Sequence, residues 1–168
     1  MARRAWIGWR CSSCGGLITK IEEGWVEWLA SDDEAGAAHL RDLRLVHRWV
    51  IDSGSSQSHG CRFDGRREFR KDRSIVEGLS LERFVGPDGL MLLLSFVAQG
   101  EMPTEDVLEL TKRLQIPGYE QIRELADDAG KAGVITPVIA RRYYIQSEIR
   151  ELLRWRATET KSPRNTAA

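Results

Sequence analysis

The residues best suited to carry chemistry in this chain are three cysteines and three histidines. Cys11 and Cys14 form a Cys-x-x-Cys motif that is followed by two glycines, and Cys61 is the third thiol. Two thiolates three positions apart can bind one ion across a tight turn, and glycine after the second cysteine lets backbone amides approach the sulfurs. The motif therefore predicts a metal site, with a redox-active thiol pair as the alternative.

The segment around Cys11 and Cys14 resembles the zinc knuckles of ribbon and treble-clef proteins. Zinc in such sites takes four ligands in a tetrahedron, so a histidine or a carboxylate must join the three thiolates. His47 falls within a predicted strand, whereas His59 lies in a serine-rich loop two residues before Cys61. We favour His47 because a strand positions a ligand more firmly than a loop, and we keep His59 as the alternative. Four protein ligands leave no open position, so the predicted zinc is structural and not catalytic.

Two strands are expected to position these ligands. Residues 17–29 include the aromatic-rich run Trp-Val-Glu-Trp-Leu, and residues 42–51 alternate in a pattern that places His47 on the apolar face. An antiparallel pairing would bring the end of the second strand back beside the start of the first, close to Cys11 and Cys14. We interpret residues 31–41 between them as a short helix or a loop.

From Gly86 onward the sequence reads as helices joined by short turns. Gly86-Pro-Asp-Gly breaks the chain, with Asp88 placed to cap the next helix and Thr104 placed to cap the one after it. We also expect a short helix within residues 75–85. The second half is predicted to contain helices over residues 89–99, 105–115, 119–132 and 147–157, and two short strands within residues 134–145.

Residues 89–145 resemble a winged helix-turn-helix domain. The resemblance lies in Leu90 to Leu108, where one helix ends in a polar turn before a capping threonine, and in Ile122 to Ile135, where a helix ends in Ala-Gly-Val-Ile. It implies DNA binding by a recognition helix at residues 119–131. The whole chain is also similar to bacterial proteins of unassigned activity that share its Cys-x-x-Cys start and its Gly-Pro-Asp-Gly-Leu helix. The winged-helix resemblance implies base contacts from Gln121 and Arg123 and phosphate contacts from Arg141 and Arg142.

Charge weighs against a simple DNA-binding interpretation. Lysine plus arginine and aspartate plus glutamate each number 25, so the net charge is zero. The expected recognition helix carries four carboxylates, which phosphates would repel. The densest basic stretch lies elsewhere, beside Cys61, and we prefer it as the nucleic-acid contact. Its candidate residues are Arg66, Arg67, Arg70 and Lys71.

These observations predict an α+β protein without a catalytic constellation. We expect a zinc-stabilised β module over residues 1–85, a winged-helix-like module over residues 86–157 and a disordered tail over residues 158–168. The predicted function is a non-enzymatic DNA-binding regulator, with a protein-interaction or self-association module as the alternative. The longest apolar run is about half of the ~20 residues that a membrane helix needs, so we expect a cytoplasmic protein.

Overall fold

The computed structural model describes residues 8–32, 36–48, 61–140 and 142–159 of the chain. The fold is α+β and divides into two compact units, Met1–Gln115 and Ile116–Ala168, each with a hydrophobic core of its own. The predicted strand-rich and helix-rich modules meet at 85/86, whereas these units meet at 115/116. Among the described residues, no helix is both long enough and apolar enough to cross a membrane.

The first unit is built on a three-stranded antiparallel sheet. Its strands are β3 (Gly24–Asp32), β4 (Ala38–His47) and β5 (Ile75–Ser80), in the order β4-β3-β5. The predicted antiparallel pairing of the two long strands is confirmed, with Gly24 opposite His47. The pairing continues to Asp32 opposite Ala38, so strand residues replace most of the helix or loop expected at 31–41.

Residues 75–85 contain the expected short helix only as a 3-10 turn near their end. They form β5 and a 3-10 turn, η2 (Leu81–Phe84). Exposed and partly buried side chains alternate along β5, which is the pattern of a strand with one face covered. Six residues of such a pattern also fit a short helix, so the pairing with β3 decides the outcome.

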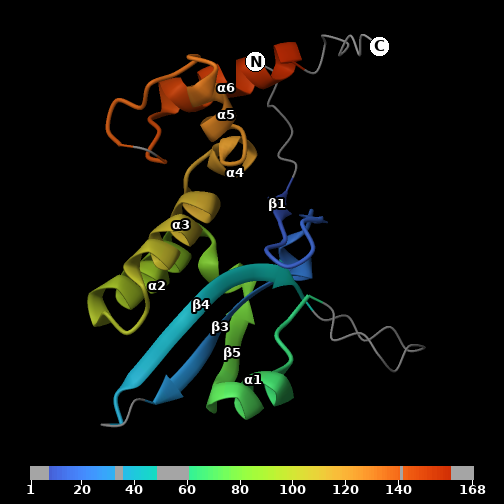
Figure 1. The fold of residues 1–168 in the computed structure, drawn as a ribbon, viewed down its shortest axis with the longest axis vertical. Helices are drawn as coiled ribbons and strands as arrows, with labels where there is room; N and C mark the ends of the chain where they lie inside the picture. The colour runs from blue at the N-terminus through green and yellow to red at the C-terminus, as the bar shows by residue number, and fades with distance from the viewer. Residues whose placement is uncertain (1–7, 33–35, 49–60, 141, 160–168) are drawn as a thin grey trace, which may run out of the picture. The chain divides into compact units, whose positions relative to one another are not determined.

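Two helices cover one face of the sheet, as Figure 1 shows. They are α2 (Gly86–Gln99) and α3 (Thr104–Gln115), which confirms both predicted helices. Leu93 and Val107 from these helices are fully buried with Val26 and Leu45 from the sheet. This shared core explains why the unit extends to residue 115: burying the helices' apolar stripes requires the sheet. α2 begins three residues before the predicted start, after Val85, and Asp88 lies in its first turn instead of capping it.

The charged segment after Cys61 forms α1 (Gly65–Asp72), which the sequence did not predict as a helix. Asp64 caps it, accepting hydrogen bonds from the backbone amides of Arg66 and Arg67 at 3.0 and 3.2 Å. α1 buries none of its own residues and packs against β5.

The second unit contains α4 (Tyr119–Ile122), α5 (Ala126–Lys131) and α6 (Gln146–Glu159). A single helix was expected at 119–132, but it is broken between α4 and α5. Like charges four residues apart, at Glu120, Glu124 and Asp128, disfavour a continuous helix there. The two expected strands at 134–145 reduce to one isolated bridge, between Ala140 and Tyr143. The predicted last helix is confirmed; it runs through Glu159, and the rest of the expected tail lies outside the described residues.

Candidate metal centre

Cys11 and Cys14 lie on a turn between two very short strands. β1 (Trp9–Arg10) and β2 (Leu17–Ile18) pair antiparallel, and Cys11 N donates a hydrogen bond to the Gly16 carbonyl at 2.8 Å. Gly16 N approaches Cys14 Sγ at 3.4 Å, and a Cβ on Gly16 would lie 3.3 Å from that sulfur. Glycine therefore lets the amide reach the thiol, as the sequence predicts. A redox Cys-x-x-Cys usually opens a helix, whereas this one joins two strands.

Arg113 of α3 holds the turn against the unit. This buried side chain donates to the carbonyl of Arg10 at 2.5 Å and to Ser12 Oγ at 3.2 Å. The indole of Trp9 in turn donates to the Arg113 carbonyl at 3.3 Å. Sequence reasoning missed this anchor, because Arg113 lies 101 and 103 residues along the chain from Ser12 and Arg10, and nothing in a helical arginine marks it as buried.

His47 and Cys61 complete the cluster. His47 ends β4, and the antiparallel pairing returns it to the turn as predicted. The ligand atoms of Cys11, Cys14, His47 and Cys61 all lie within 4.8 Å of one another. The structure thus brings together the three predicted cysteines and the favoured histidine. The alternative ligand, His59, lies outside the described residues.

Two distances within the cluster match those expected at a shared tetrahedral ion. His47 Nδ1 lies 3.4 Å from Cys14 Sγ and 3.6 Å from Cys61 Sγ. Zinc bonds of about 2.3 Å to sulfur and about 2.0–2.1 Å to nitrogen, at tetrahedral angles, place the two atoms about 3.6 Å apart. A neutral imidazole nitrogen offers one lone pair, so two thiols cannot both be well satisfied by hydrogen bonds to it. A cation between the three atoms satisfies both contacts at once.

The other nitrogen of His47 faces a backbone carbonyl. Nε2 lies 3.2 Å from the oxygen of Leu17 on β2. A neutral imidazole that donates its Nε2–H to this carbonyl leaves the Nδ1 lone pair directed at the sulfurs. Metal-ligating histidines commonly donate their second N–H to a carbonyl or carboxylate in this way. The ring is therefore oriented as a ligand.

The electrostatics of the thiols also favour a cation. Burial opposes ionisation of the Cys11 thiol, but backbone hydrogen bonds from Cys14, Ser13 and His47 and one from the Cys61 thiol outweigh it. The pKa of Cys11 falls from 9.0 to about 7 as a result. Burial and the neighbouring sulfurs of Cys14 and Cys11 raise the pKa of Cys61 to about 12. Ionisation of one thiol thus opposes ionisation of the next, and three thiolates need a positive charge among them.

A second unpredicted group lies next to Cys61. Glu27 of β3 is fully buried, and its carboxylate accepts hydrogen bonds from the side chains of Arg44 and Arg62 and from the backbone amide of Phe63. In the sequence, Glu27 reads as the polar position of an alternating strand. Its burial depends on the segment after Cys61 folding over this face of the sheet, which periodicity alone does not reveal.

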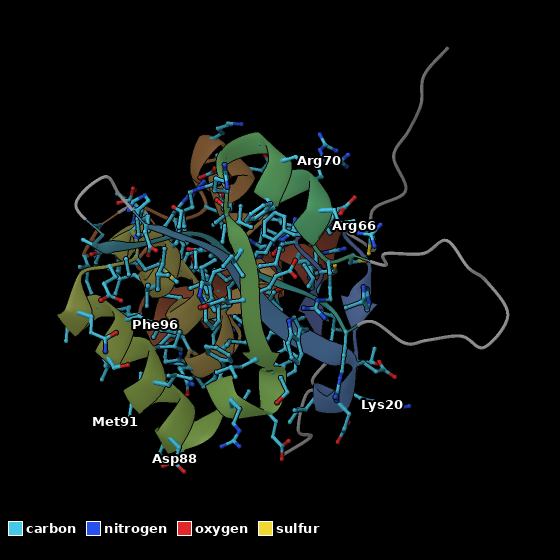
Figure 2. The ribbon with its side chains drawn as sticks, turned by 90° about the horizontal axis from the view of Figure 1, so that it is seen from below. Lys20, Arg66, Arg70, Asp88, Met91 and Phe96 are labelled. Carbon is cyan, nitrogen blue, oxygen red and sulfur yellow. The ribbon has the colours of Figure 1, made fainter. Side chains whose placement is uncertain are left out.

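The predicted nucleic-acid contacts fall into two groups. Arg66, Arg67, Arg70 and Lys71 all lie on α1 and are exposed. Figure 2 shows Arg66 and Arg70 at the outer edge of the first unit. None of these four side chains forms an ion pair with another residue that the structure describes.

The candidates in the second unit are more constrained. Arg123 lies 3.3 Å from Glu120 and 3.9 Å from Glu124, and Arg142 lies 4.0 Å from Asp127. Gln121 is half-buried on α4, and its backbone carbonyl accepts a hydrogen bond from the side chain of Arg156 at 3.1 Å. Arg141 lies outside the described residues. Carboxylates thus partly neutralise the cationic candidates of this unit that the structure describes.

No protein-family model matches the chain, and no curated protein or solved structure matches it either.

Proposed function

We propose that this protein is a non-enzymatic, DNA-binding regulatory protein whose first unit is held together by a structural zinc ion. The observation that carries the proposal is the Cys₃His cluster, whose Cys61 lies three residues before Asp64, the cap of the basic helix α1. The zinc site and the DNA contact involve different residues, and either one can exist without the other.

Zinc is the ion that best suits the cluster. Three thiolates and one imidazole are a common structural zinc donor set, and a tetrahedron of four protein ligands leaves no position for substrate or water. The ligands come from the β1–β2 turn, the end of β4 and the start of the segment before α1. An ion bound there would cross-link three parts of the chain and add its binding free energy to folding.

Metal analysis of the purified protein tests the zinc site. The expected result is one zinc per chain, with His47→Ala and Cys61→Ser each weakening binding and lowering the melting temperature. A His39→Ala variant is the matched control, since His39 lies on the same strand as His47 outside the cluster. Full zinc content in His47→Ala would move the fourth ligand elsewhere, and a wild type without zinc would remove the site.

The DNA contact is proposed for α1. Arg66 and Arg70 are four residues apart, as are Arg67 and Lys71, so the four cations form two adjacent rows on one side of the helix. Two of the three acidic neighbours are engaged, since Asp64 caps the helix and Asp72 pairs with Arg41 at 2.6 Å, which leaves the four cations beside Glu68. The basic side chains can therefore meet phosphates while the chain as a whole is uncharged.

Fluorescence anisotropy with mixed-sequence duplex DNA tests this contact. We expect binding at low salt that weakens as salt increases, with a slope in log K against log salt of about 0.9 per neutralised phosphate. Replacing Arg66, Arg67, Arg70 and Lys71 by glutamine should abolish binding. Arg123→Gln with Arg142→Gln is the matched control and should bind almost normally. Absence of binding by the wild type at low salt would reject the DNA-binding role.

A protein-interaction role is the second candidate, and α2 supplies the observation that favours it. The run from Gly89 to Gly100 contains no charged residue, and Met91 and Leu94 on its surface are 66% and 47% exposed. Self-association through this helix would persist at high salt, in contrast to DNA binding. Sedimentation at increasing protein concentration, for the wild type and for Met91→Glu with Leu94→Glu, separates the two roles.

A further inference from the structure

Glu27 is a buried carboxylate that the metal centre itself does not use. It lies in the middle of β3, the central strand, and is 0% exposed. Arg44 of the neighbouring strand donates to its Oε1 from Nε at 3.0 Å and from Nη2 at 2.7 Å. A buried ion pair is seldom more stable than apolar residues of the same size, so its presence points to a positional role.

Among the described residues, the remaining side-chain hydrogen bonds of Glu27 go to the segment that begins with Cys61. Arg62 Nε donates to Oε2 at 3.3 Å, and the backbone amide of Phe63 donates to Oε1 at 3.0 Å. Both oxygens of the carboxylate thus hold residues that follow the metal ligand directly. A backbone amide bonded to a buried carboxylate also fixes the path of the chain and not only that of a side chain.

Arg44 also contacts the same segment directly. Its Nη2 donates to the carbonyl oxygen of Cys61 itself at 3.2 Å, and its guanidinium carbon lies 3.4 Å from the centre of the Phe63 ring. Glu27 and Arg44 together therefore contact three consecutive residues, Cys61, Arg62 and Phe63. The clamp ends where the Asp64 cap of α1 begins.

We propose that Glu27 and Arg44 form a positioning clamp that holds residues 61–63 on the sheet and thereby presents Cys61 to the metal. This inference rests on the proposed metal site. The other three ligands come from the β1–β2 turn and the end of β4, which the strand pairings position. Cys61 has no strand to place it, so the clamp replaces one. Without the clamp, the site keeps Cys11, Cys14 and His47 but loses its fourth ligand.

Cobalt substitution combined with thiol mapping tests the clamp. The intensity of thiolate-to-cobalt charge transfer reports how many thiolates bind the ion, and alkylation with mass spectrometry reports which cysteines the metal protects. In wild type we expect three bound thiolates and three protected cysteines. In Glu27→Ala we expect two of each, with Cys61 alkylated while Cys11 and Cys14 stay protected. Metal affinity should fall about tenfold or more, as it does when ligand-supporting residues are removed.

Two further variants separate positioning from general destabilisation. Leu93→Ala removes a fully buried side chain of α2 in the same unit and should keep the three-thiolate spectrum despite lower stability. Glu27→Gln keeps one acceptor oxygen and should recover part of the charge-transfer intensity lost in Glu27→Ala. If Glu27→Ala does not fold, Arg44→Lys supplies the measurement, because lysine keeps the charge but loses the two-pronged contact.

The outcomes distinguish this inference from the metal site on which it rests. Three protected cysteines in both Glu27→Ala and Arg44→Lys would overturn the clamp and leave the metal site intact. A wild type that binds neither cobalt nor zinc through thiolates would overturn the metal site and the clamp together. Selective release of Cys61 in the Glu27 variant, absent from Leu93→Ala, would establish the clamp.

Discussion

The two faces of the central strand β3 are stabilised by different kinds of interaction. On one face, Val26 and Trp28 are buried beneath the helical layer, where Trp28 meets Phe96 edge to face with ring centres 5.5 Å apart. On the other, Glu27 is buried in a network of arginines beside the cysteine cluster. The first face depends on many weak apolar contacts, and the second on a few directional bonds and the proposed ion.

This difference predicts how each face fails. An apolar face loses stability in proportion to the surface it no longer buries, so its response to substitution is gradual. A site with four ligands loses its geometry when one ligand leaves, so its response is abrupt. The face of β3 that carries Val26 and Trp28 should therefore tolerate substitution, and we call it the tolerant face. The face that carries Glu27 beside the cysteine cluster should not, and we call it the brittle face. Variants on each face can test this contrast.

Removal of one ligand should have the largest effect. Cys61→Ser is expected to lose most of its metal affinity and on the order of 5 kcal/mol of stability, because structural zinc is worth about 10–16 kcal/mol in small zinc domains. Metal content and urea denaturation measure both quantities. Ser13→Ala, at an exposed position in the same turn, is the control and should retain both. Unchanged metal affinity in Cys61→Ser would show that the brittle face does not depend on the ion.

A cavity in the apolar face should cost less and leave the ion in place. Leu93→Ala is expected to lower the free energy of unfolding by about 2–5 kcal/mol, the range for a fully buried leucine, without changing the metal stoichiometry. Urea denaturation followed beside metal content measures both. Loss of metal from this variant in its folded state would mean that the two faces are coupled more tightly than their contacts indicate.

The metal-free protein should show a pH dependence that arises on the brittle face. The pKa of Cys11 is about 7 in the folded chain against 9.0 for an unperturbed thiol. Between these values the unfolded thiol holds a proton that the folded one has released, so stability should increase from pH 7 to pH 9 and be lost as pH falls through 7. Urea denaturation of chelated protein across this window measures the slope. Cys11→Ser should lack this contribution, and an equal slope in that variant would assign the effect to other groups.

The sequence predicted the residues of the site better than what surrounds them. Cys11, Cys14 and Cys61 follow from residue type and spacing, and the preference for His47 follows from its place in a predicted strand. These inferences succeed because ligand chemistry allows few residue types and the strand pattern is long. The Glu27 clamp was missed, since the partners of a buried charge come from a distant segment whose path the pattern does not encode.

The secondary structure also contains elements that the sequence predicted and elements that it did not. The chain breaks and expected caps around α2 and the apolar stripe of α3 predicted both helices within a few residues. The short elements were predicted less well: a short helix was expected within residues 75–85, where β5 and a 3-10 turn form, and α1 was not expected at all. Neither has enough apolar periodicity to identify it, because β5 depends on pairing with β3 and α1 buries none of its residues. The winged-helix resemblance remains a prediction, with the helices it groups divided between the two compact units.

The smallest expected effect concerns α1, which extends from the brittle face. Asp64→Ala removes the side chain that caps the amides of Arg66 and Arg67 and should cost about 1 kcal/mol. Because α1 buries no residue, this loss should fray the helix without unfolding the sheet. Hydrogen exchange should therefore speed up at residues 65–72 and remain unchanged in α2.

Asp88→Ala is the matched control for the cap, because Asp88 lies in the first turn of α2 without capping it. It should leave exchange in both helices nearly unchanged. Zinc content should also be normal in Asp64→Ala, since the clamp on residues 61–63 lies before the cap. If α1 instead exchanges no faster in Asp64→Ala than in wild type, contacts with β5 hold the helix. The helical structure of α1 would then be stabilised by its contacts with the sheet and not by the Asp64 cap that follows the metal centre.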